Sequence, residues 1–243
     1  MLVAAGWLGC QRPGRDPAAV RAYVVHLVQA PFQKLAADFE RESGVRVDAI
    51  YACRRFLHEA AAKNGDGDLY INSNRATLDE VRKRGLATGS PATIAELVPA
   101  IVVMKANPKQ IATLADLAKP GVRVCLGDPK GCMGSVADQI LQNARVADKV
   151  APNVVLRAPG EFDLARSVDG KKIDAAIVWA SVVLEIERKD VEIIPIPPEA
   201  NITEPVDLLI LDTGKNKTGA TRLAAFLQTP KAQKTLAEAR LKR

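Results

Sequence analysis

A glycine-rich loop between a strand and a helix holds the residues that most clearly suggest chemistry. The apolar run Val122 to Leu126 predicts a buried strand, the sequence GDPKG follows it, and an apolar-periodic helix is expected to begin at Ser135. The first N–H groups of a helix have no intrahelical acceptor, and the helix dipole adds partial positive charge there. This arrangement suits a small anion, although similar loops also occur as purely structural turns. Cys132 and Met133 place two sulfur atoms in the same loop.

The cysteines form a second group of candidates. Cys10, Cys53, Cys125 and Cys132 lack the paired spacing of a zinc site. Cys125 lies inside the apolar strand and is expected to be a small buried hydrophobe. If Cys10 is modified, three thiols remain. Either two of them form a disulfide or thiols serve a binding site, with simple packing as the alternative.

Composition argues against several classes of function. The chain of 243 residues has a formal net charge of +6, but its basic residues are interspersed with 28 acidic ones and only 4% of residues are aromatic. A nucleic-acid-binding surface is therefore not expected. The sequence has no uninterrupted apolar window of about 18 residues, as a membrane-spanning helix requires. Motifs of serine hydrolases, P-loop proteins and zinc proteases are also absent, so no enzyme and no cofactor are predicted.

The N-terminus resembles a bacterial lipoprotein signal. The apolar run MLVAAGWLGC ends at Cys10, and a stretch rich in Pro and Gly follows. Residues 1–18 are therefore expected to be a signal and linker, with the mature protein lipid-anchored through Cys10 in the periplasm or on the outer face of the membrane. The run has no basic segment before it, and an N-terminus without function is the alternative.

Strands and helices alternate along the rest of the chain. Apolar periodicity predicts early strands at 20–28, 45–52 and 68–72, each followed by an amphipathic helix. Such alternation is typical of α/β domains with mixed, mainly parallel sheets and right-handed crossovers.

Two extended segments, near 97–105 and 205–212, are expected to be hinge strands between two such domains. The prediction is a first domain of residues 19–103 plus 209–243 and a second domain of residues 104–208. Clefts between domains are favoured ligand sites.

Four segments in this order resemble the type II periplasmic solute-binding proteins, specifically the molybdate/tungstate-binding family of ABC importers. They are FQKLAADFERESGVRVDAIY, GDGDLYINSNRATLDEVRKRGLA, TLADLAKPGVRVCLGDPKGCMGSVADQIL and DGKKIDAAIVWAS. The resemblance extends from about residue 20 to the C-terminus. It implies a monomer that captures a small inorganic ion, such as molybdate or tungstate, and delivers it to the membrane permease of an ABC importer.

The resemblance also implies where the ligand is held, through neutral N–H and O–H donors of five segments. By correspondence, the ligand-binding residues here are His26, Gln29, Cys53, Arg54, Cys132, Met133, Gly134, Ser135, Glu161 and Trp179. The chain departs from the family pattern at four places. The loop after the central strand is one residue shorter and has Cys132 and Met133 where a proline-containing segment is usual. Cys53 and Arg54 stand where a serine is usual, Trp179 replaces a tyrosine, and Glu161 brings a carboxylate near the site.

These departures leave two classes of ligand open. The guanidinium of Arg54 matches the oxygens of an oxyanion. Cys53, Cys132 and Glu161, supported by His26 and Met133, would instead suit a thiophilic or transition-metal ion.

Several site residues also have plainer interpretations. Arg54 and Glu161 could pair with each other across the cleft. His58 is expected to be solvated, and Asp128 is expected to form an Asx-type turn. A third functional class, a ligand-free adaptor or sensor, would keep the fold and lose the site.

Overall fold

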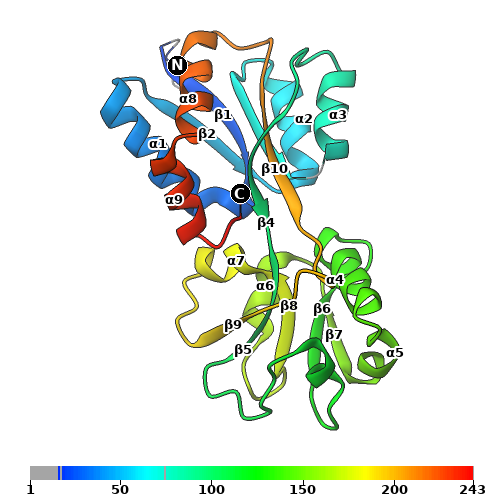
Figure 1. Cartoon of the computed structure of the whole chain (residues 1–243). Coiled ribbons are helices and arrows are strands. Elements are labelled where there is room, and N and C mark those ends of the chain that lie inside the picture. Colours follow the sequence, from blue (N-terminus) through cyan, green and yellow to red (C-terminus); the bar gives the residue numbers. More distant parts are fainter. Residues whose placement is uncertain (1–15, 17, 74, 243) are drawn as a thin grey trace, which may run out of the picture.

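The protein consists of two α/β lobes joined at a narrow waist (Figure 1). A computed structural model describes residues 16, 18–73 and 75–242, so the predicted lipidation site at Cys10 lies outside the described residues. Each lobe contains one five-stranded sheet, with strand order β2-β1-β3-β10-β4 in the first and β7-β6-β8-β5-β9 in the second. The predicted fold class, two α/β domains with mixed sheets, is confirmed. None of the described helices is long and apolar enough to span a membrane.

The first lobe is built from both ends of the described chain. Its elements are β1 (Val20–Val25), η1 (His26–Val28), α1 (Gln29–Ser43), β2 (Val47–Ala52), α2 (Arg54–Asn64), β3 (Leu69–Ser73), α3 (Arg75–Lys83), β4 (Ala92–Leu97), β10 (Glu204–Ile210), α8 (Lys217–Leu227) and α9 (Pro230–Glu238). β1 pairs in parallel with β2 and β3, whereas β10 runs antiparallel to β3 and β4.

The second lobe is formed by the middle of the chain. Its elements are β5 (Pro99–Met104), η2 (Leu114–Ala118), β6 (Val124–Gly127), α4 (Cys132–Asn143), α5 (Ala147–Val150), η3 (Ala151–Asn153), β7 (Val154–Ala158), α6 (Glu161–Ser167), β8 (Ala175–Trp179), α7 (Ala180–Glu185) and β9 (Val191–Pro195). β6 pairs in parallel with β7 and β8, and β5 runs antiparallel to β8 and β9.

The chain crosses between the lobes at Val98, between β4 and β5, and returns just before Glu204 at the start of β10. The expected domain boundaries, 103/104 and 208/209, each lie inside a strand that belongs wholly to one sheet. The apolar pattern of residues 97–104 continues through the first crossing, whereas Pro99 lacks the N–H needed to continue a ladder. We therefore propose domain boundaries at Val98 and immediately before Glu204.

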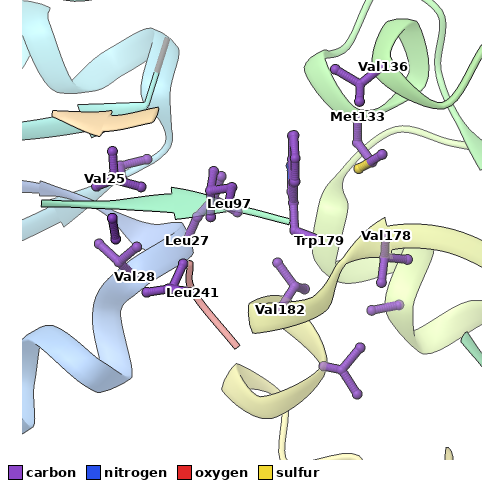
Figure 2. Close-up of a cluster of buried hydrophobic side chains, with 14 of the residues drawn as sticks. Val25, Leu27, Val28, Leu97, Met133, Val136, Val178, Trp179, Val182 and Leu241 are labelled. Carbon is purple, nitrogen blue, oxygen red and sulfur yellow. The ribbon is translucent and has the colours of Figure 1, made fainter. Parts of the chain in front are cut away.

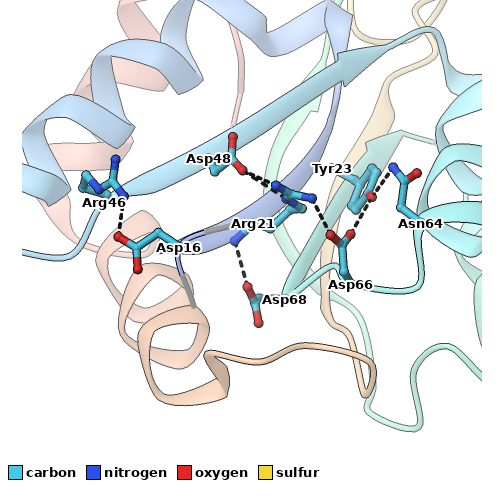
Figure 3. Close-up of polar contacts among 8 residues, drawn as sticks. All are labelled: Asp16, Arg21, Tyr23, Arg46, Asp48, Asn64, Asp66 and Asp68. Atoms are coloured by element: carbon cyan, nitrogen blue, oxygen red, sulfur yellow. Dashed lines mark hydrogen bonds and ion pairs between the residues drawn. The ribbon is translucent and has the colours of Figure 1, made fainter. Parts of the chain in front are cut away.

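A network of polar side chains stabilises the first sheet (Figure 3). Arg21 of β1 donates from Nε to Asp48 Oδ2 of β2 at 3.0 Å and also forms an ion pair with Asp66. Asp66 accepts a hydrogen bond from the Tyr23 hydroxyl at 3.1 Å, and Asn64 at the end of α2 donates to that hydroxyl at 2.8 Å. The network links β1, β2 and the end of α2, which helps to fix the position of this helix.

Buried apolar side chains fill the waist between the lobes (Figure 2). Trp179, at the end of β8, is fully buried. Figure 2 shows it between Leu27 and Leu97 of the first lobe and Met133 of the second. The lobes are therefore joined by packing as well as by the two chain crossings.

An ion pair with Arg123 anchors the start of β8. Asp174 accepts from Arg123 N at 2.8 Å, Nε at 2.9 Å and Nη2 at 2.7 Å, and the Arg123 guanidinium lowers the pKa of Asp174. Because this pKa is lower in the folded than in the unfolded state, the contribution to stability is present above about pH 4 and is lost as the pH falls through the folded pKa.

We expect Asp174→Asn to lower the free energy of unfolding by about 1–2 kcal/mol at pH 7, since one partner of the pair is partly solvated. Urea titrations at pH 7 and pH 3 measure this, and the gap between wild type and variant should shrink at pH 3. The matched control is Asp148→Asn, because Asp148 is exposed and forms no ion pair with any described residue. A gap that stays constant with pH would contradict the assignment.

Candidate functional site

A cleft of about 450 Å³ lies between the two lobes. The first lobe contributes the ends of β1 and β2 and the starts of α2 and α3, and the second contributes the loop after β6 and the start of α6. Its lining residues are His26, Leu27, Cys53, Arg54, His58, Thr77, Asp128, Lys130, Gly131, Cys132, Pro159 and Glu161.

The loop between β6 and α4 forms one wall of the cleft. Asp128 Oδ1 accepts a hydrogen bond from Lys130 N at 2.8 Å, which is the expected Asx-type turn. Gly131 N donates to Asp128 O at 2.8 Å, and Gly131 is the N-cap of α4. The helix therefore begins at Cys132, three residues before the predicted start at Ser135, because the turn ends at Gly131. Cys132 thus stands at a helix N-terminus, where N–H groups lack intrahelical acceptors.

Two glycines allow this loop to lie directly on the helix. A Cβ at Gly134 would lie 1.9 Å from the carbonyl oxygen of Asp128, and a Cβ at Gly127 would lie 2.7 Å from Gly134 N. Both distances are far shorter than any real carbon contact, so a side chain at either position would force the backbones apart. The geometry of this wall therefore depends on Gly127 and Gly134.

The opposite wall is the N-terminus of α2. Cys53 is the N-cap of this helix, and its carbonyl oxygen accepts from Phe56 N at 3.0 Å and from Leu57 N at 3.2 Å. The Cys53 side chain is exposed. Beside it, His26 Nδ1 lies 3.2 Å from the carbonyl oxygen of Ala52, and the His26 ring lies 5.1 Å from the ring of Phe162 in the second lobe.

Arg54 pairs with Glu204 rather than with Glu161. Arg54 Nη1 lies 3.2 Å from Glu204 Oε2 at the start of β10. Burial raises the pKa of Glu204, Arg54 lowers it, and the nearby carboxylate of Glu161 raises it further. Glu204 was missed by sequence reasoning because it lies about 150 residues from Arg54 along the chain.

The raised pKa of Glu204 gives a pH-dependent stability. Stability from this group is fully present below the unfolded pKa of about 4.5 and is lost as the pH rises through the higher folded value. The stability of wild type relative to Glu204→Gln should therefore fall between pH 4 and pH 7. Thermal unfolding across that range measures it, with the exposed Glu199→Gln as control. A relative stability that rises with pH would show that the pair with Arg54 outweighs burial.

The structure brings five of the predicted ligand residues together and places five elsewhere. His26, Cys53, Arg54, Cys132 and Glu161 line the cleft, whereas Gln29, Met133, Gly134, Ser135 and Trp179 do not.

Each of the other five has a different place. Gln29 starts α1, and Gly134 is buried against Asp128. Ser135 Oγ donates to Cys132 O at 3.0 Å. Met133 and Trp179 belong to the apolar cluster at the waist, and the Trp179 indole Nε1 has no hydrogen-bond partner among the described residues.

Two further residues of the cleft, His58 and Lys130, were missed as site residues. His58, expected to be solvated, lines the cleft, and its Nδ1 is buried without a partner among the described residues. Lys130 is exposed in the cleft wall and forms no ion pair with any described residue. The apolar periodicity of residues 54–64 predicts that His58 lies on the polar face of its helix. It does not predict that the second lobe lies opposite this face. Lys130 belongs to the sequence GDPKG, a pattern that predicts a turn and does not by itself predict a binding side chain.

The predicted metal ligands Cys53, Cys132 and Glu161 share the cleft. Within the part of the chain that the structure describes, no group of three or more His, Cys, Asp and Glu side chains is placed to hold a metal ion. Among the described residues, the cleft presents the N-termini of α2 and α4, Lys130 without an ion pair, the thiols of Cys53 and Cys132, and the carboxylates of Asp128 and Glu161.

Known proteins are similar to this chain in sequence. The molybdate-binding protein ModA of Mycobacterium tuberculosis is 25% identical over 245 residues, which cover 97% of this chain and 92% of the relative. A sulfate-binding protein of Synechococcus elongatus is 23% identical over 92% of this chain and 72% of its own length.

Among solved structures, the substrate-binding domain of an ABC transporter from Clostridium difficile superposes with a TM-score of 0.82 at 15% identity, covering 93% of this chain and 98% of that chain. The fold is that of the type II periplasmic binding proteins. The sequence profile of the bacterial extracellular solute-binding proteins matches residues 20–239, and this chain belongs to that family.

Proposed function

We propose that this protein captures a small inorganic oxyanion, of the molybdate or tungstate type, in the cleft between its lobes and delivers it to an ABC permease. The observation that carries the proposal is the pairing of two helix N-termini across one cleft. α2 begins beside Cys53 on one wall and α4 begins at Cys132 on the other. Helix N-termini favour anions through free N–H groups and the helix dipole.

The charges around the cleft support an anion as the ligand. Lys130 lines it without an ion-pair partner among the described residues, so its charge is available. Arg54 also lines it, and its charge is partly offset by Glu204. Relatives that bind molybdate and sulfate agree with this class of ligand.

Closure of the lobes is the proposed mechanism. Each wall supplies only part of the donor set, so an anion completes its hydrogen bonds when the lobes approach each other around the two crossings near Val98 and Glu204. The ligand then favours the closed shape, which the permease recognises. No step alters the ligand chemically, and we propose a monomer without enzymatic activity or nucleic-acid partner, located in the periplasm or anchored to the membrane through Cys10.

Calorimetric titration of the reduced protein with tungstate, molybdate, sulfate and phosphate tests the proposal. We expect one tungstate or molybdate per chain. Lys130→Gln should weaken binding about tenfold, since a hydrogen bond to a charged donor contributes about 1.5 kcal/mol or more. The matched control is Lys149→Gln, because Lys149 is an exposed lysine of α5, outside the cleft. Equal affinities for both variants would remove Lys130 from the site.

A thiophilic ion is the second candidate, favoured by the presence of the free thiols of Cys53 and Cys132 in the same cleft. Titration with Zn²⁺, Cu(I) and arsenite, repeated on Cys53→Ser, separates it from the first. Binding of a soft ion alone, lost in the serine variant, would replace the oxyanion. Binding of none of these ions would favour a ligand-free adaptor or sensor.

A further inference from the structure

Two accessible cysteines lie on opposite walls of the cleft. Cys53 belongs to the first lobe, Cys132 belongs to the second, and both line the cleft as free thiols. Cys53 follows β2 and is the N-cap of α2, whereas Cys132 is the first residue of α4, 79 positions later in the sequence. Nothing in the oxyanion mechanism requires a thiol on either wall.

The backbone at both cysteines is fixed. Cys53 accepts two helix-initiating hydrogen bonds at its carbonyl, and Cys132 is the first residue of α4, where its carbonyl accepts from Ser135 Oγ at 3.0 Å. Each thiol therefore moves with its lobe. Closure around Val98 and Glu204 changes the separation of the two sulfurs while leaving their local surroundings in place.

The third described cysteine is not an alternative partner. Cys125 lies within β6, has no exposed surface, and burial raises the pKa of its thiol. A thiol reacts with an oxidant only if the oxidant can reach it and the thiol can lose its proton. Among the described residues, Cys53 and Cys132 are therefore the two cysteines that a soluble oxidant can reach.

We propose that Cys53 and Cys132 form a disulfide across the cleft when the lobes close, so that oxidation locks the protein in its closed state. This redox latch regulates the same cleft as the proposed function, and its effect on ligand release rests on that function. The bond itself requires only closure. Disulfide formation needs Cα atoms within about 7 Å, so the bond reports the approach of the two walls.

The chemistry balances with a disulfide oxidant such as oxidised glutathione. One thiolate attacks the oxidant, which forms a mixed disulfide on the protein and releases one glutathione thiol. The second thiolate then attacks the protein sulfur of that mixed disulfide, forms the Cys53–Cys132 bond and releases the second glutathione thiol. Two electrons pass from the protein thiols to the oxidant, and the two thiol protons end on the two displaced glutathione thiolates.

The experiment uses the full chain carrying Cys10→Ser, so that only the three described cysteines remain. Reduced protein is treated with oxidised glutathione, quenched by alkylation and digested without reductant. Mass spectrometry should find Cys53 joined to Cys132, while Cys125 is recovered as an unoxidised thiol. Cys53→Ser and Cys132→Ser, each in the same background, are matched controls that should give no intramolecular bond.

Thermal unfolding provides a second readout. The oxidised Cys10→Ser protein should melt about 5 °C above the reduced form, and the Cys53→Ser variant should show no such difference. Tungstate should accelerate formation of the disulfide, and oxidation in its presence should slow tungstate release several-fold. If the disulfide forms at the same rate with and without tungstate, the redox latch is supported and the proposal that tungstate is a ligand is contradicted.

Two results would overturn the latch. One is stable glutathione adducts on Cys53 and Cys132 that do not resolve into an internal bond. The other is exclusive formation of disulfide-linked dimers. Either would show that the two walls do not meet, whatever the outcome of the tungstate titration.

Discussion

Trp179→Ala is expected to lower the free energy of unfolding by about 4 kcal/mol, the usual cost of removing a fully buried tryptophan side chain. The effect is large because Trp179 lies in the apolar cluster that joins the lobes, between Leu97 of the first and Met133 of the second. Truncation leaves a cavity that neighbours from two separate lobes cannot readily fill. Urea unfolding followed by circular dichroism measures this loss.

Trp179→Phe is the matched control for that variant. Phenylalanine keeps an aromatic ring and removes the indole N–H, whose nitrogen has no partner among the described residues. The loss should therefore be less than half that of the alanine variant. Two results would contradict this account: the same loss in free energy of unfolding for both variants, or a loss under about 1 kcal/mol for Trp179→Ala. Either would show that packing around Trp179 contributes little to the stability of the protein.

Gly134→Ala should lower the free energy of unfolding by about 3 kcal/mol and abolish tungstate binding. The added Cβ would lie 1.9 Å from the Asp128 carbonyl oxygen, so the loop that forms one cleft wall must move away from α4. Calorimetric titration and thermal unfolding of the purified variant test both effects.

Gly89→Ala is the control for this substitution, because a Cβ there meets no atom within 4 Å. Its stability and tungstate affinity should match those of wild type. A Gly134→Ala protein that still binds tungstate with wild-type affinity would mean that the loop after β6 is not part of the binding site.

The sequence predicted the two lobes well because their elements are locally encoded. Apolar periodicity and helix-ending glycines are short-range signals, and Gly44 and Gly65, for example, end α1 and α2 in left-handed conformations. The domain boundaries were harder to predict, since the strands β5 and β10 look alike as extended apolar runs. Their assignment to a sheet depends on pairing with distant strands.

The cleft was only half predictable for the same reason. The GDPKG loop was predicted from residue type and order, and Cys53 and Cys132 were placed at the ligand by correspondence with the resembled family; residues of the loop and both cysteines line the cleft. The ion pair between Arg54 and Glu204 forms because the chain re-enters the first lobe at β10. No local sequence pattern predicts that Glu204 then lies beside Arg54. The family resemblance implies Trp179 as a ligand residue, in place of a tyrosine, but its large apolar ring is buried at the waist instead.

A crystal structure of the reduced protein grown with tungstate tests the central claim most directly, because tungsten scatters X-rays anomalously and marks its own position. The proposed function predicts one anomalous peak per chain, in the cleft between the loop carrying Lys130 and the start of α2 beside Cys53. A peak outside the cleft, or none in crystals grown with excess tungstate, would contradict capture of this oxyanion between the lobes.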